Sequence, residues 1–128
     1  MSHVNIQPWQ SHNLRETFLG FIRVHLLHHA AQERIYGTAM IDELRRHGYE
    51  LSPGTLYPIL HALEEAGYLA SEQEAEAGKV RRYYRATPEG EVVLEALKAS
   101  IRELTAEVLT PKRSPRAPRP AASKQRSR

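Results

Sequence analysis

Two of the positions at which a hydroxyl residue directly precedes proline constrain the fold of this chain most. A hydroxyl just before a helix accepts a hydrogen bond from an unpaired backbone N–H, and proline at the first helical position has no N–H to lose. Ser52–Pro53 and Thr87–Pro88 both have this arrangement. Helices are therefore predicted to begin at residues 53 and 88.

Apolar residues at helical spacing extend this pattern. A first helix is predicted at 14–33, because Asn13 and Glu16 are spaced as a capping box ahead of an apolar stripe. A short second helix is predicted to end at Gly48, which suits a left-handed cap, and the third helix continues to Gly67. Two helices joined by a tight turn that contains glycine form a helix-turn-helix candidate.

The rest of the pattern predicts a hairpin and a long last helix. Segments 68–74 and 80–86 flank a connector with one glycine; the second has strand composition, and the first could also be extended loop. The last helix is predicted to reach about Leu109, with apolar residues spaced as a seam against another helix. The order predicts a mainly α fold: a winged helix-turn-helix, with three helices and a two-stranded wing, followed by a long dimerisation helix.

Composition narrows the class of protein. The 128 residues suit one winged-helix domain at 13–87 and a dimerisation helix at 88–110, with a flexible arm at 1–12 and a disordered, basic, proline-rich tail at 111–128. The chain has no cysteine for disulfides or thiolate chemistry, and no catalytic motif, so we do not expect an enzyme. It has no secretion signal and no long apolar run, so we expect a cytoplasmic protein with no membrane partner.

The basic character of the chain comes from its tail. Residues 111–128 hold seven of the 18 basic residues, which leaves 11 basic against 15 acidic residues in positions 1–110. Overall charge therefore does not argue for DNA binding. Within this acidic part, however, Lys79, Arg81, Arg82 and Arg85 gather in the predicted hairpin, with Arg82 on the face opposite Arg81 and Arg85. This clustering favours phosphate contacts over a merely solvated charged face.

The outward face of the third helix is the predicted DNA-reading surface. Leu56, Leu60 and Leu63 share the inward face, and free backbone N–H groups at the helix start suit a phosphate. The alternatives are that Tyr57 only packs on the domain and that Pro58 only distorts the first turn. The predicted DNA-contacting residues are Ser52, Gly54, Thr55, Tyr57, Pro58, His61, Lys79, Arg81 and Arg82.

Histidines in the first helix are candidate metal ligands. His25 and His29 are four residues apart, which presents two imidazoles to one ion, and Glu16 or a second chain could supply further ligands. Because these histidines also lie on the apolar stripe, they could instead be neutral core or interface residues. A divalent metal is therefore an open alternative, and no other cofactor is expected.

Several linked motifs resemble one known family. PadR-family regulators have a recognition segment similar to Ser52-Pro53-Gly54-Thr55-Leu56-Tyr57-Pro58-Ile59-Leu60, continued here by Leu63-Glu64 and Gly67-Tyr68-Leu69. Tyr36-Gly37 resembles the start of that family's second helix, and Arg81-Arg82-Tyr83-Tyr84 resembles its second wing strand. The resemblance covers about residues 14–109. It implies a repressor that binds double-stranded DNA at a palindromic operator as a homodimer and is released by a small effector.

The single long helix resembles the short subfamily, in which that helix and the first helix build the dimer. The interface residues that this implies are Leu94, Leu97, Ile101, Leu104, Val108, Phe18 and Ile22. Ala62 departs from the family pattern, because many relatives carry a basic residue there. Direct base contacts from the third helix are therefore expected to be weaker, and the wing more important for DNA binding. Two alternatives stay open: a metal-responsive sensor that uses the histidines of the first helix, and a protein-interaction module with no specific DNA target.

Overall fold

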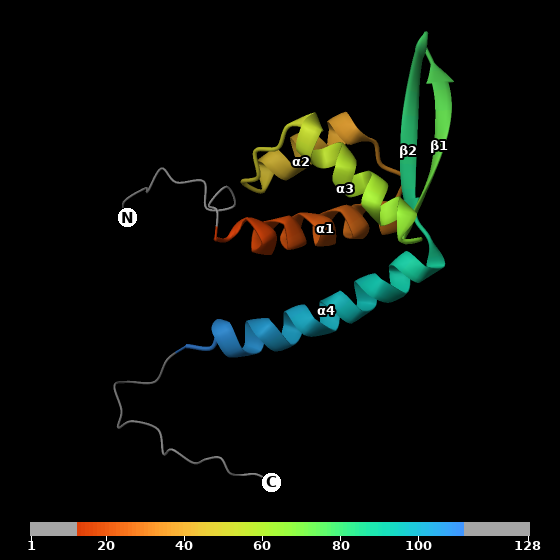
Figure 1. Cartoon of the computed structure of the whole chain (residues 1–128). Helices are drawn as coiled ribbons and strands as arrows, with labels where there is room; N and C mark the ends of the chain where they lie inside the picture. Colours follow the sequence, from red (N-terminus) through yellow and green to blue (C-terminus); the bar gives the residue numbers. More distant parts are fainter. Residues whose placement is uncertain (1–12, 112–128) are drawn as a thin grey trace, which may run out of the picture.

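The structure, a computed structural model, describes residues 13–111. The predicted arm at 1–12 and nearly all of the predicted tail lie outside these residues. The elements follow in the order α1 (Arg15–Gln32), α2 (Gly37–Arg46), α3 (Pro53–Glu65), β1 (Leu69–Glu76), β2 (Lys79–Ala86) and α4 (Pro88–Val108). The first three helices pack together, the hairpin projects from one end of them, and α4 runs back beside α1 (Figure 1). The predicted winged helix-turn-helix with a long last helix is confirmed.

Local capping explains where α3 and α4 begin and where α2 ends. Ser52 Oγ accepts a hydrogen bond from the backbone N–H of Thr55 at 3.3 Å, and Thr87 Oγ1 accepts one from Gly90 at 2.9 Å. Gly48, which follows α2, has a φ of +94°, the left-handed conformation that glycine adopts without strain. The helix starts at residues 53 and 88 and the glycine cap of α2 are therefore confirmed.

The capping box predicted for the first helix is wrong. α1 begins at Arg15 and its N-cap is Leu14, with no side-chain hydrogen bond to the cap. Asn13 therefore lies one residue too early to accept from the first turn, since a capping side chain must occupy the N-cap position itself.

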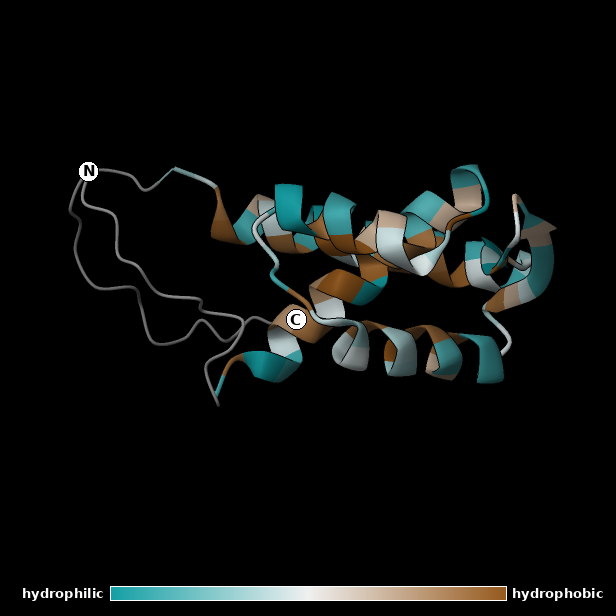
Figure 2. Ribbon diagram, turned by 90° about the horizontal axis from the view of Figure 1, so that it is seen from above, coloured by the Kyte–Doolittle hydropathy of each residue, from teal (hydrophilic) through white to brown (hydrophobic). Residues whose placement is uncertain are grey.

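One apolar cluster joins the three helices and the base of the hairpin. Leu26, Leu44, Leu56 and Leu60, from α1, α2 and α3, have no exposed surface. The hairpin adds two buried side chains from its base, and α4 adds Leu94. Apolar and polar segments alternate along the helices in Figure 2, as expected for helices that are buried on one face. None of the helices in residues 13–111 has the length and apolarity needed to span a bilayer.

The hairpin is longer and more regular than its sequence indicated. β1 extends over the full first segment and pairs antiparallel with β2, from Leu69 opposite Ala86 to Glu76 opposite Lys79. The two-residue turn has positive φ at both Ala77 and Gly78, +51° and +79°, as in a type I′ turn. At the other end, Ile35 and Tyr84 exchange two backbone hydrogen bonds of 2.8 Å, which fix the hairpin to the α1–α2 connection.

Candidate nucleic-acid interface

α3 has a buried face and an outward face. Leu56, Ile59, Leu60 and Leu63 are buried in the core. On the other side, Gly54, Pro58, His61 and Ala62 are exposed, and Thr55 and Tyr57 are half-buried. The predicted division of this helix is confirmed. Its outward side is not covered by the described part of the chain. A ligand as large as a DNA duplex can therefore reach it.

Tyr57 packs within the helix-turn-helix. A Cβ added to Gly37, the first residue of α2, would overlap the Tyr57 phenol, so the ring lies directly against the backbone of α2. The packing alternative for Tyr57 therefore describes its position correctly. The ring also remains partly accessible on the outward side, 6.5 Å from the ring of His61.

Pro58 does not break α3. The helix continues from Pro53 to Glu65 with Pro58 inside it. The structure therefore does not support the alternative that Pro58 distorts the first turn. Because proline has no N–H, the carbonyl of Gly54 lacks its helical donor. Gly54 is exposed, and water can take the place of that donor.

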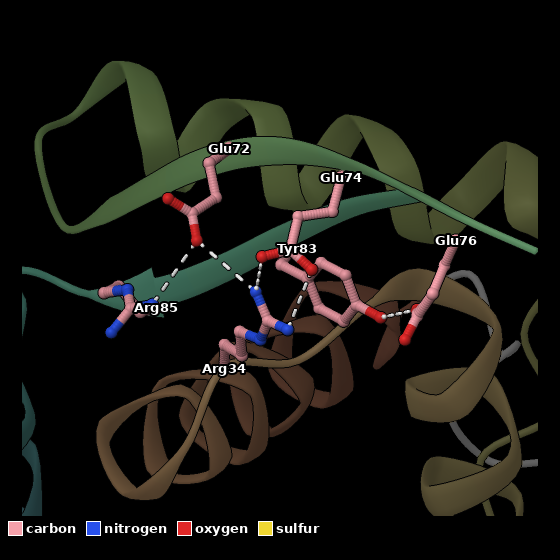
Figure 3. Close-up of polar contacts among 6 residues, drawn as sticks. All are labelled: Arg34, Glu72, Glu74, Glu76, Tyr83 and Arg85. Carbon is pink, nitrogen blue, oxygen red and sulfur yellow. Dashed lines mark hydrogen bonds and ion pairs between the residues drawn. The ribbon is translucent and has the colours of Figure 1, made fainter. Parts of the chain in front are cut away.

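One face of the wing is a network of ion pairs (Figure 3). The Arg34 guanidinium, from the α1–α2 connection, donates to both carboxylate oxygens of Glu74 at 2.6 and 3.0 Å, and lies 3.9 Å from the centre of the Tyr83 ring. The Tyr83 hydroxyl donates to Glu76 at 3.1 Å. The hydrogen bond to Arg34 lowers the pKa of Glu74, and the same bond raises the pKa of Arg34. Arg34 thus holds the acidic side of the wing to the helical body.

Two of the predicted phosphate-binding cations also belong to this face. Arg85 lies 3.5 Å from Glu72 across the hairpin. Arg81 is placed 4.2 Å from the centre of the Tyr36 ring and is the register partner of Glu74. The register of the hairpin thus sets the glutamates of β1 beside these two cations of β2.

The remaining two cations of β2 are free to meet an anion. Arg82 lies on the opposite face, where it donates to Ser71 Oγ at 2.9 Å, and Ser71 in turn donates to Glu64 of α3 at 2.7 Å. Lys79 begins β2 beside the turn and is exposed. Within residues 13–111, neither Lys79 nor Arg82 forms an ion pair. Arg82 is thus oriented on the same side of the wing as α3.

The predicted histidine pair is brought together with a third histidine. His25, His29 and His47 each offer a ligand atom, and these atoms all lie within 4.8 Å of one another. Glu16 is not in this group; it precedes His25 by nine residues, roughly 13 Å along a helix. The prediction of Glu16 as a ligand is therefore wrong. Burial lowers the pKa of His25 and of His29, which favours neutral rings.

An apolar groove separates α1 from the second half of α4. Its volume is about 740 Å³, and its walls include Phe21, Val24, Leu97, Ile101, Leu104 and Val108. Ile101, Leu104 and Val108 are 43%, 51% and 64% exposed, respectively. The sequence did not identify Phe21 and Val24 as groove residues, because the apolar stripe of α1 is wide and its spacing does not separate core from groove.

The structure corrects the α1 part of the predicted interface. Ile22 has no exposed surface within one chain and belongs to the core, so a second chain cannot reach it. Phe18 is half-buried and packs edge-on against Phe21, with ring centres 5.5 Å apart. Leu94, in the first half of α4, is also buried in the core of its own chain.

Comparisons with known proteins agree with this geometry. The family model described as the transcriptional regulator PadR-like family matches residues 26–96. The transcriptional regulator Rv3488 of Mycobacterium tuberculosis is 49% identical over 96 residues, which are 75% of this chain and 90% of that protein.

Solved structures resemble the whole described fold. A PadR family transcriptional regulator from Eggerthella lenta has 36% identity and a TM-score of 0.66, over 74% of this chain and 84% of the other. A PadR-like transcriptional regulator from Bacillus cereus has 27% identity and a TM-score of 0.67, over 73% of this chain and 93% of the other. The similarity thus includes the helices, the wing and the last helix together.

Proposed function

Because the chain belongs to the PadR-like family of transcriptional regulators, we propose that it binds a specific DNA operator as a homodimer. The family relation makes the chain a transcriptional regulator and not an enzyme. The observation that carries the proposal is the outward face of α3, which the described part of the chain leaves uncovered. The major groove of B-DNA, about 12 Å wide, admits a helix presented in this way.

The start of α3 would hold the DNA backbone, and its exposed side would face the bases. Pro53 has no N–H and the N–H of Thr55 is directed to Ser52, so the N–H of Gly54 is left for a phosphate at the positive end of the helix. His61 would reach a base edge or a phosphate one turn beyond Tyr57. Pro58, beside them and exposed, would contribute an apolar contact. In this arrangement Tyr57 both packs on α2 and limits how deeply α3 enters the groove.

The wing would contact the backbone beside the groove through Lys79 and Arg82. Neither cation forms an ion pair among residues 13–111, Lys79 is exposed beside the turn, and Arg82 lies on the α3 side of the wing. Arg81 would have to leave the Tyr36 ring and the neighbourhood of Glu74 to reach a phosphate. We therefore assign Arg81 mainly to positioning the wing, and we assign the phosphate contacts to Lys79 and Arg82.

A second copy of the chain would fill the groove between α1 and α4. The seam at Leu97, Ile101, Leu104 and Val108 has the spacing with which helices pack on one another, and its outer half lacks a cover within the described part of one chain. A twofold arrangement lets the same apolar surface serve both chains, since each presents it to the other. The operator would then be palindromic, with half-sites about 34–36 Å apart.

Repression is the outcome that this arrangement supports best. A bound dimer would cover its operator, and a small effector that shifts α4 against α1 would change the separation of the two α3 helices. The two recognition surfaces would then no longer match half-sites one helical turn apart. The operator would be released without any change in α3 itself.

The test is DNA retardation by the chain after residues 111–128 have been deleted. Without the basic tail, we expect genomic fragments that contain the operator still to be retarded at low salt, in the presence of excess unrelated DNA. If the shortened chain retards no genomic fragment, the proposal fails, and a protein-interaction module that uses α4 becomes the better description.

A further inference from the structure

Three imidazoles from two separate elements meet beside the helix-turn-helix. His25 and His29 lie on successive turns of α1, and His47 is the C-cap of α2. Their ligand atoms lie within 4.8 Å of one another, and the rings of His25 and His47 have centres 4.7 Å apart. Tetrahedral ligands bound to one ion about 2.1 Å away lie at roughly 3.4 Å from each other, so small side-chain rotations would close this group on a single ion.

A carboxylate lies next to two of the three rings. Glu43 Oε2 is 3.1 Å from His47 Nε2 and 3.6 Å from His29 Nε2. Arg46, one turn further along α2, holds the other oxygen of Glu43. Carboxylates in this position are typical of histidine metal sites, where they orient the rings or supply negative charge to the ion. Glu43 is therefore a positioning group, or a fourth ligand, for an ion at this place.

We propose that His25, His29 and His47 bind one divalent transition metal ion per chain. Imidazole nitrogens suit zinc, cobalt and nickel, whereas magnesium and calcium prefer oxygen ligands. Three protein nitrogens leave a fourth position of a tetrahedral zinc site for water or for Glu43. The site would join α1, which lines the proposed dimer groove, to the end of α2, the first helix of the helix-turn-helix.

Metal binding by the untagged full chain tests this inference without DNA. Calorimetric titration with zinc chloride should show one saturable site per chain, and magnesium chloride at the same concentration should show none. Cobalt chloride should give the strong visible absorption bands of tetrahedral cobalt. Zinc should also raise the melting temperature, because an ion that binds only the folded chain stabilises it.

Single substitutions identify the ligands. His47→Ala and His29→Ala should weaken zinc binding at least tenfold and abolish the cobalt bands, and Glu43→Gln should weaken it by about 10- to 100-fold. His28→Ala is the matched control, because His28 is exposed on the same helix and is outside the group. Its affinity for zinc should equal that of the unchanged chain.

Two results would overturn the inference. One is the absence of saturable zinc binding by the unchanged chain. The other is zinc binding that His47→Ala leaves intact in a protein whose circular dichroism is unchanged. His47 is exposed, so its substitution is expected to leave the fold intact, and a loss of metal binding can be separated from a loss of structure.

Discussion

At Gly90, the chain packs too closely for any side chain. A Cβ at this position would overlap the backbone carbonyl oxygen of Tyr68, which accepts a hydrogen bond from the N–H of Thr87 at 3.0 Å. Thr87 also donates through its hydroxyl to the carbonyl of Gly67 at 2.6 Å. The start of α4 is thus joined to the end of α3 through close backbone contacts.

We expect Gly90→Ala to lower the free energy of unfolding by about 1–3 kcal/mol, the usual cost of overpacking a rigid site. Gly54→Ala is the matched control, because Gly54 is also in a first helical turn but its added Cβ would meet Ser52 Oγ at an ordinary 3.6 Å. Urea denaturation of both variants measures the difference. Equal stability of the two would show that the α3–α4 junction is looser than the structure indicates.

Two neighbouring tyrosines of β2 differ in how their hydroxyls are satisfied. Tyr84 is 1% exposed, and its hydroxyl has no hydrogen-bond partner among residues 13–111. The adjacent Tyr83 is also buried, but its hydroxyl donates to Glu76. A buried polar group without a partner costs stability, and a paired one contributes to it.

Tyr84→Phe should therefore leave the free energy of unfolding unchanged or raise it by up to about 2 kcal/mol, whereas Tyr83→Phe should lower it by about 1 kcal/mol. Thermal and urea denaturation of the pair provide the measurement, and each variant is the control of the other. A clear loss of stability in Tyr84→Phe would mean that its hydroxyl is paired in solution.

At the scale of elements, the wing is a strand pair of opposite charge and not a basic strip. The glutamates of β1 offset the positive charge of Arg34, Arg81 and Arg85 on one face of the wing. Such exposed ion pairs add little stability individually. In the proposed DNA complex, these ion pairs would leave fewer cations of the wing for a phosphate.

Lys79→Ala and Arg82→Ala should each reduce the salt dependence of operator binding. The slope of log affinity against log salt should fall by about 0.9 for each phosphate that is no longer neutralised, summed over both chains of the dimer. Arg85→Ala is the control from the same strand and should leave the slope nearly unchanged. Fluorescence anisotropy at several salt concentrations gives these slopes. A larger change for Arg85→Ala than for Arg82→Ala would contradict the assignment of faces.

At the scale of the whole molecule, α4 is anchored at one end and uncovered at the other. Its first half is held by Leu94 in the core and by the contact at Gly90, and its second half leaves an apolar seam exposed. A helix that is anchored in the core at one end and exposes apolar residues at the other is suited to joining two chains, while each chain folds around its own core.

Ile101→Glu should convert the proposed dimer to a monomer and abolish operator binding at protein concentrations at which the unchanged chain binds. The reason is that burying the glutamate carboxylate in an apolar interface, without a partner of opposite charge, costs free energy. Val92→Glu is the matched control, because Val92 is 70% exposed on α4 and is not part of the groove wall. Sedimentation velocity distinguishes the two states. If Ile101→Glu sediments as a dimer, the second copy does not occupy the groove.

The sequence determined the elements of this protein because their signals are local. Ser52 and Thr87 cap helices through bonds to residues three positions further along, and Gly48 adopts its left-handed turn from its own conformational freedom. Caps, turns and apolar spacing therefore predicted the order of helices and hairpin, together with the outward face of α3. Asn13 shows the limit of such signals, since the helix begins after Leu14 and the predicted cap has no role.

Only the tertiary structure decided which distant side chains meet. Arg34 and Glu74 are 40 residues apart, and their pairing depends on how the hairpin lies against the α1–α2 connection. His47 lies beside His25 and His29, and the ring of Tyr57 packs against the backbone at Gly37. Both contacts form because α1, α2 and α3 pack around one core. No local spacing encodes these contacts, since they follow from the angles at which whole helices pack. The candidate sites therefore became complete only when the elements were placed together.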